Sequence, residues 1–167
     1  MVASFEALVR SSDGERVDLY ALGVRFLIGG SQTGGRFSVV EHPLPGRSLG
    51  SPLHTHHRED EYSFVVEGQF GIQLGDDILD AGPGDLITKP RGVPHAFWNR
   101  GDEPGRLLEI ISPAGFEGYF RELAPLLTAS GGQRDEAAIR RLLDRYQLSL
   151  DFATVPVLAK RHGLRLG

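Results

Sequence analysis

The sequence contains no cysteine, and this absence removes several classes of chemistry. Without thiols the chain has no disulfide framework, no thiolate metal site and no thiol nucleophile. It also lacks any apolar stretch near the ~20 residues of a membrane-spanning helix. The N-terminal residues lack the basic and apolar regions of a signal peptide. We therefore expect a cytoplasmic protein that has no membrane partner.

An excess of positive charge is also missing. The formal net charge of -4 gives no electrostatic basis for binding a nucleic acid. The one basic cluster is Lys160, Arg161 and Arg165, and such a short run is typical of a solvated helix end. A chain of 167 residues with 40% apolar and 24% charged residues is ordinary for a globular protein and long enough for one buried core.

Glycine and proline are abundant, with 22 and 10 residues, and most of them separate short runs that are typical of strands. The predicted strands are 16–21, 24–28, 37–42, 53–56, 62–66, 70–74, 78–80, 86–88, 95–98 and 107–111. In "QFGIQLG" the apolar residues alternate with Gln and Gly, the period of a sheet with two different faces. The glycine-rich "GGSQTGG" lacks the lysine of a phosphate loop and is interpreted as a hairpin turn. An antiparallel all-β sandwich or barrel is therefore expected.

The pattern becomes helical after residue 112. Ser112 and Pro113 predict a cap and first turn for a helix that ends near residue 128. A second helix is predicted over 135–146 and a short third one over 156–163. We expect residues 1–112 to form the barrel, including its N-terminal strands, and residues 113–167 to pack on it as a helical extension within one domain.

The chemistry is concentrated in "PLHTHHREDE", where histidines and acidic residues cluster. His54 and His56 are two apart, so on a strand they project to the same face. Glu61 rejoins that face only if the residues from His57 to Asp60 turn or bulge. His95 opens a distant predicted strand, and together these side chains predict a mixed nitrogen and oxygen site for a divalent transition metal. The isolated His42 and His162 are interpreted as surface or hydrogen-bonded residues.

Two spaced motifs contain these residues. The first runs G50-x3-H54-x-H56-x4-E61-x6-G68, and the second runs G84-x5-P90-x-G92-x2-H95-x3-N99. They resemble the two motifs of the cupin superfamily over roughly residues 35 to 112. The first departs only in its leading glycine, which usually lies five residues before the histidine and which is not a ligand.

The resemblance implies a small antiparallel cupin barrel, also described as a double-stranded β-helix or jelly roll, with two or three C-terminal helices. It also implies one divalent transition metal, Fe, Mn, Ni, Co, Cu or Zn, in the mouth of the barrel. The implied ligands are His54, His56, Glu61 and His95.

The substrate pocket is predicted from strand parity. Phe97 shares the face of His95 and points inward, while Trp98 faces the other way and packs elsewhere. Phe116 and Phe120 of the first predicted helix are further candidates for the pocket wall. Parity assigns no inward cation, and this favours an aromatic substrate over an acidic one.

The flanking segments "RFLIGGSQTGGRFSVVEHPLPG", "HTHHREDEYSFVVEG" and "SPAGFEGYFRELA" resemble the one-domain, quercetin 2,3-dioxygenase-like cupins. This resemblance implies a dioxygenase that cleaves a flavonol or another enolisable aromatic substrate with O2. In that reaction Glu61 is the expected catalytic base, accepting the proton of the substrate hydroxyl.

Two alternatives remain open, because a fold alone does not name a reaction. One is a cupin that binds a metal and a small ligand without catalysis, and the other is a metal-dependent isomerase or lyase acting on a small oxo-acid or sugar. The sequence "GRSLG" matches the nucleophile-elbow pattern, but a proline and a strand follow it where that elbow requires a helix. A homodimer is expected, as is common for one-domain cupins.

Overall fold

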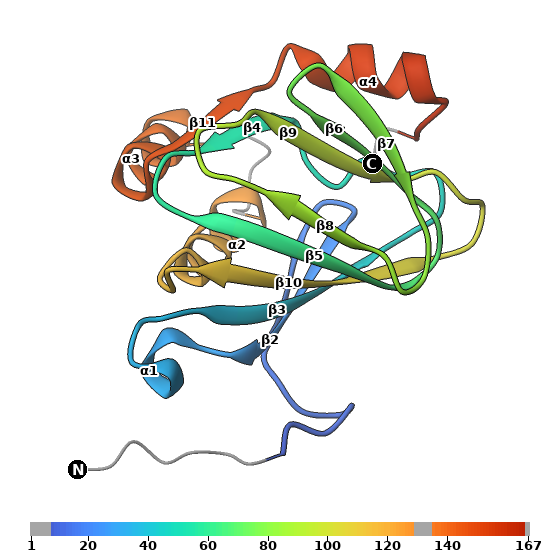
Figure 1. The fold of residues 1–167 in the computed structure, drawn as a ribbon. Coiled ribbons are helices and arrows are strands. Elements are labelled where there is room, and N and C mark those ends of the chain that lie inside the picture. The colour runs from blue at the N-terminus through green and yellow to red at the C-terminus, as the bar shows by residue number, and fades with distance from the viewer. Residues whose placement is uncertain (1–7, 129–134, 166–167) are drawn as a thin grey trace.

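The computed structural model describes residues 8–128 and 135–165, which form two antiparallel β-sheets and several helices (Figure 1). The strands are β1 (Arg16–Leu19), β2 (Leu22–Ile28), β3 (Ser38–Leu44), β4 (Leu53–His56), β5 (Asp60–Glu67), β6 (Phe70–Leu74), β7 (Asp77–Ala81), β8 (Leu86–Lys89), β9 (His95–Asn99), β10 (Gly105–Ser112) and β11 (Leu148–Asp151). The helices are α1 (Gly30–Thr33), α2 (Glu117–Thr128), α3 (Glu136–Tyr146) and α4 (Thr154–His162). In Figure 1, α2 and α3 lie on one side of the sheets, and α4 lies above the sheet that contains β9. Among the described residues no helix is long and apolar enough to cross a membrane.

The two sheets have the strand orders β1-β2-β3-β10-β5-β8 and β11-β4-β9-β6-β7. Burial alternates strictly along β10, where Leu107 and Ile111 point inward. They join Val65, Phe70 and Ile72 in one core that lies between the sheets. The prediction of an antiparallel all-β barrel is therefore confirmed, and β4 and β6 have the predicted bounds.

The segment after residue 112 differs from the sequence prediction in two respects. The first helix begins at Glu117, four residues later than expected, and its carboxylate accepts hydrogen bonds from the backbone N–H groups of Gly30 and Gly115. Residues 148–151 form β11, which the sequence analysis left out of the sheet, and which pairs antiparallel with β4. The chain turns from α3 into this strand at Gln147, whose φ of 49° ends the helix.

The loop "GGSQTGG" also differs from the predicted simple turn. It contains the single helical turn α1, which is closed by a hydrogen bond from Gly29 N–H to the Gln32 side chain at 2.8 Å and ends at Gly34 in the left-handed region. The segment still links two antiparallel neighbours, β2 and β3.

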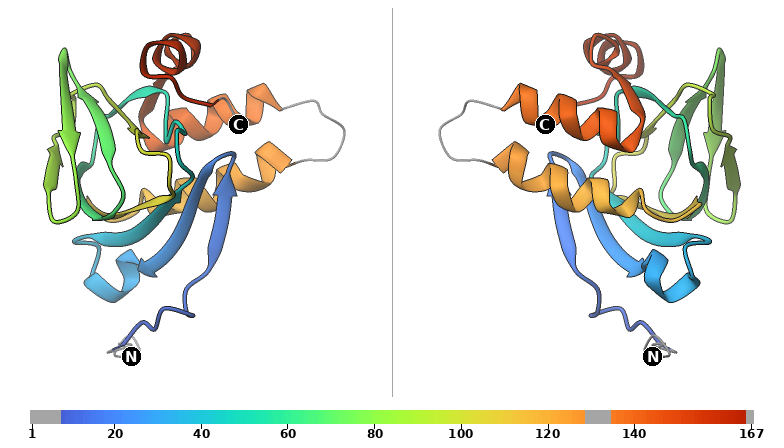
Figure 2. Two further views of the ribbon diagram at one scale, coloured as in Figure 1. Left: turned by 90° about the vertical axis from the view of Figure 1, so that its right-hand side faces the viewer. Right: turned by 90° about the vertical axis from the view of Figure 1, so that its left-hand side faces the viewer.

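The helices extend the core on one side of the barrel. Figure 2 shows α2 and α3 side by side there, with α4 apart from them. Phe116, Phe120 and Leu142 of this region belong to the main core between the sheets. By contrast, α4 packs through Leu158 on Trp98, on the outer face of β9.

The indole ring of Trp98 occupies space that is left free by a glycine in the neighbouring strand. Gly71 pairs with Trp98 across β6 and β9, and a methyl group at Gly71 would overlap the indole ring. Trp98 also stacks on the imidazole of His162, with 4.1 Å between the ring centroids. The prediction that Trp98 faces away from the predicted metal ligands and packs elsewhere is therefore confirmed, because it packs on Leu158 and His162.

We predict that Gly71→Ala lowers the free energy of unfolding by about 1–3 kcal/mol, because overpacking forces the indole or the strand to shift. Urea denaturation measures this change. Gly29→Ala is the matched control, since the added methyl would lie 3.8 Å from its nearest neighbour. A loss in Gly71→Ala no larger than in the control would contradict the packing argument.

Candidate metal centre

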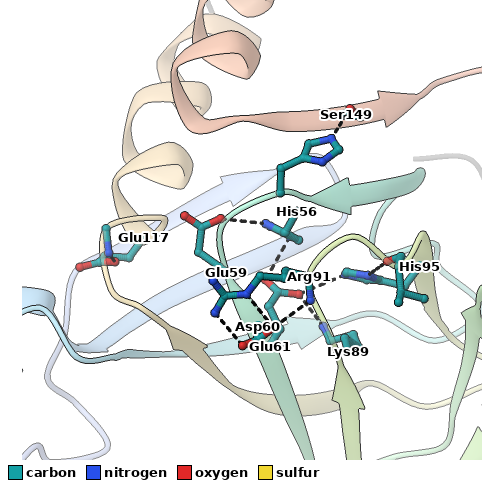
Figure 3. A network of polar contacts seen from close by, with 12 residues as sticks. His56, Glu59, Asp60, Glu61, Lys89, Arg91, His95, Glu117 and Ser149 are labelled. Atoms are coloured by element: carbon teal, nitrogen blue, oxygen red, sulfur yellow. Dashed lines mark hydrogen bonds and ion pairs between the residues drawn. The ribbon is translucent and has the colours of Figure 1, made fainter.

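The four predicted ligands meet inside the barrel. One ligand atom from each of His54, His56, Glu61 and His95 lies within 4.8 Å of the others, and all four residues are buried. The histidines come from β4 and β9, and the carboxylate comes from β5 (Figure 3). The cluster thus joins residues that are distant in the sequence.

Local pairing explains how the chain brings them together. His54 is the register partner of His95 across β4 and β9. The chain then turns between β4 and β5, as predicted, and Asp60 fixes the turn by accepting hydrogen bonds from the backbone N–H and the guanidinium of Arg91. His57 points away from the cluster and bonds to Ser149 Oγ at 2.8 Å. The turn therefore restores Glu61 to the face of His54 and His56.

Backbone carbonyls fix the tautomers of two of the imidazoles. Nδ1 of His54 lies 2.9 Å from the carbonyl oxygen of Pro52, and Nδ1 of His95 lies 3.0 Å from that of Val93. A carbonyl oxygen only accepts hydrogen bonds, so each Nδ1 carries the proton and each Nε2 presents a lone pair. Nε2 of His95 lies 3.2 Å from the Glu61 carboxylate.

The third imidazole, that of His56, faces a carboxylate on its Nδ1 side, where the other two face backbone carbonyls. Nδ1 of His56 faces the buried carboxylate of Glu59 at 3.7 Å, and neither atom has a hydrogen-bond partner among the described residues. Nε2 of His56 lies 3.3 Å from Glu61 Oε1. A carboxylate behind a histidine is a common means of orienting a metal ligand.

The pKa shifts of His54, His95 and Glu61 favour the forms that bind metals. Burial, with repulsion from His95 and His56, holds the pKa of His54 well below its usual range, and burial also lowers the pKa of His95. Burial acts to raise the pKa of Glu61, but His56 and Lys89 outweigh it and hold this pKa well below its usual range. Neutral imidazoles and an ionised carboxylate are the forms that ligate metals. The buried cluster therefore fits a divalent transition metal, whose identity the donor set does not select.

A buried ionic chain adjoins the cluster, and sequence reasoning missed it. Nζ of Lys89 lies 2.8 Å from Glu61 and 3.0 Å from Glu109, whose carboxylate also accepts a hydrogen bond from Ser63 at 2.7 Å. Lys89 and Glu109 are 2% and 1% exposed. Burial raises the pKa of Glu109 to about 7, although Lys89 opposes the shift. Parity with Ile87 on β8 was the available signal for an inward Lys89.

The cluster opens on a cavity of about 540 Å³. Phe97, Phe116 and Phe120, which the sequence analysis suggested as pocket residues, all line it. The phenyl ring of Phe116 packs edge-on against His56, with 4.3 Å between the centroids, and against Phe120 at 5.3 Å. Three aromatic rings thus form the part of the cavity wall next to the candidate metal ligands, and leucines of several elements form much of the rest.

Comparison with known protein families matches the part of the chain that contains the four clustered residues. A family model described as "Cupin domain" matches residues 40–111. A search of curated proteins found no significant match.

Solved structures share the fold at low sequence identity. KdgF from Halomonas sp. is 18% identical with a TM-score of 0.60, covering 68% of this chain and 98% of that chain. A predicted oxalate decarboxylase from Thermotoga maritima is 21% identical with a TM-score of 0.58, covering 64% and 98%. A sugar phosphate isomerase of the cupin superfamily from Silicibacter pomeroyi is 24% identical with a TM-score of 0.55, covering 63% and 74%. The chain therefore has the cupin fold.

We predict that Lys89→Met lowers the free energy of unfolding by about 3–5 kcal/mol, because it leaves Glu109 buried without its cation. The double variant Lys89→Met/Glu109→Leu should recover at least about 1 kcal/mol of that loss, since it removes the stranded carboxyl as well. Chemical denaturation of the metal-free proteins measures both values. A double variant less stable than the single one would contradict the pairing.

Proposed function

We propose that the chain is a metal-dependent dioxygenase that binds an enolisable aromatic hydroxy compound, such as a flavonol, and cleaves it with O2. The observation that carries this proposal is the junction between the metal-ligand cluster and the cavity walled by Phe97, Phe116 and Phe120. Aromatic walls stack on flat aromatic ligands.

In this proposal the Nε2 atoms of the three clustered histidines and the Glu61 carboxylate hold the metal. A divalent metal bound there supplies Lewis acidity, which favours the oxyanion of a substrate hydroxyl. Glu61 Oε2 accepts the hydroxyl proton, and the ammonium group of Lys89 at 2.8 Å orients that oxygen. Phe97, Phe116 and Phe120 hold the substrate ring and exclude water from the reacting oxygen.

A second candidate is an isomerase or lyase acting on a small oxo-acid or sugar. It is favoured by the cations on the cavity wall, the inward ammonium of Lys89 and the guanidinium of the exposed Arg165. One of the similar structures is a sugar phosphate isomerase and another is a predicted oxalate decarboxylase. However, the ammonium of Lys89 is already ion-paired with Glu61 and Glu109, so it would attract a substrate carboxylate only weakly. The aromatic substrate is therefore the better supported of the two.

We predict that His54→Ala and His95→Ala each lower bound metal to a small fraction of the wild-type content, because each removes a proposed ligand. Elemental analysis of the purified proteins after metal loading and desalting measures the occupancy. His162→Ala is the control, since this imidazole stacks on Trp98 and is not in the cluster. Full loading of both ligand variants would contradict the proposed ligand set.

We predict that quercetin added to the metal-loaded protein causes oxygen uptake, which an oxygen electrode records for the Fe, Mn, Co, Ni and Cu forms in turn. His54→Ala should abolish the uptake. Flavone, which lacks the enolisable hydroxyl, should cause none. If quercetin causes no uptake with any of these metals, the dioxygenase is contradicted while the metal site stands.

A further inference from the structure

A further histidine, His42, lines the cavity outside the metal-ligand cluster. It lies on β3, is 3% exposed, and belongs to the aromatic wall. Its ring packs edge-on against Phe120 at 5.4 Å between centroids and lies 6.2 Å from the ring of Phe97. The sequence predicted a surface or hydrogen-bonded histidine; His42 is hydrogen-bonded, but it is buried beside the site and not at the surface.

The tautomer of His42 is fixed by the backbone. Nδ1 lies 3.1 Å from the carbonyl oxygen of Gly23, so Nδ1 carries a proton. Burial lowers the pKa of His42 to about 4, which leaves the ring neutral at neutral pH. Nε2 therefore carries a lone pair and only accepts hydrogen bonds.

No donor among the described residues pairs with this lone pair. Nε2 of His42 makes no hydrogen bond to any of them. Unlike Nδ1 of His56, which is fully enclosed and has no partner, Nε2 of His42 keeps some accessible surface. Nε2 therefore reaches the cavity as an unpaired acceptor beside the rings of Phe97 and Phe120.

The position of His42 relative to the metal-ligand cluster follows from ring contacts. From His56 the wall continues through Phe116 and then Phe120 to His42, with successive centroid distances of 4.3, 5.3 and 5.4 Å. Two phenyl rings thus separate the two imidazoles along the wall. His42 also borders Phe97, whose ring centroid lies 5.4 Å from Nζ of Lys89, so a ligand bound at the cluster can contact His42 with a second group.

We propose that His42 Nε2 accepts a hydrogen bond from a second hydroxyl group of the substrate, other than the oxygen that binds the metal. This inference rests on the proposed function and specifies its substrate class. The cavity selects aromatic compounds that carry a second hydroxyl over those that carry only the metal-binding hydroxyl. A carbonyl or carboxylate in place of the second hydroxyl leaves the acceptor unpaired and is disfavoured.

The test compares quercetin, which carries hydroxyls on several rings, with 3-hydroxyflavone, which carries only the enolisable one. Dissociation constants are measured on the Zn²⁺-loaded protein without oxygen, because Zn²⁺ has no redox chemistry. His42→Phe should weaken quercetin binding by about five- to tenfold, the value of one hydrogen bond, and change 3-hydroxyflavone binding by less than about twofold. His42→Gln, whose amide both donates and accepts, should restore most of the selectivity. His162→Phe, the same change outside the cavity, should alter neither constant.

The outcomes separate this inference from the proposed function. If 3-hydroxyflavone binds the wild-type protein and His42→Phe weakens both ligands equally or neither, the inference is overturned and the proposed function stands. If neither quercetin nor 3-hydroxyflavone binds the wild-type protein, the proposed function is overturned and the inference with it. The ¹⁵N resonance of His42 Nε2 in the wild-type protein gives a readout that needs no variant. It should shift with quercetin and not with 3-hydroxyflavone, and equal shifts would overturn the inference.

Discussion

Glu61 is a carboxylate enclosed in the interior of a β-barrel, where an unpaired charge is very costly. Its compensation determines much of the surrounding structure. On one side lie the clustered imidazoles, and on the other lies Lys89, which in turn requires Glu109. The carboxylate of Glu109 in turn accepts a hydrogen bond from the hydroxyl of Ser63. Each group is tolerable only because the next is in place, so the strands that carry them must pair in one register.

The metal-ligand cluster and the cavity have different origins in the chain. The four clustered residues all lie within the segment 40–111 that matches the cupin domain model. Phe116 and Phe120 lie after it, as do Leu148 and Leu150 of β11, and all four line the cavity. The geometry for binding a metal thus belongs to the common barrel, whereas much of the cavity wall comes from outside the matched segment. Likeness in fold is for this reason a weak guide to the substrate.

The sequence predicted the cluster better than its surroundings, and the reason is physical. Strand parity and motif spacing place His54, His56 and His95 on inward faces, and these rules need no knowledge of packing. They do not show how deeply a side chain is buried or what it meets, so the contact of Lys89 with Glu109 depends on the pairing of β8, β5 and β10. Parity likewise gave no role to His42, because its role comes from a carbonyl on β2 and from rings on two other elements. β11 was missed because its four residues lie between two helices, in a part of the chain whose sequence pattern is helical.

The pairing of β11 with β4 has a consequence for how the protein is made. Leu148 lies opposite His56, and Leu150 lies opposite His54, so the strand with two of the clustered histidines is an edge until residues 148–151 have been made. On the ribosome, the other barrel strands emerge long before residues 148–151 do. During that interval the open backbone of β4 is a surface on which other strands can add. His54 and His56 therefore gain this β-strand neighbour only after the other barrel strands have been made, and a nascent chain stalled before β11 exposes the edge beside them.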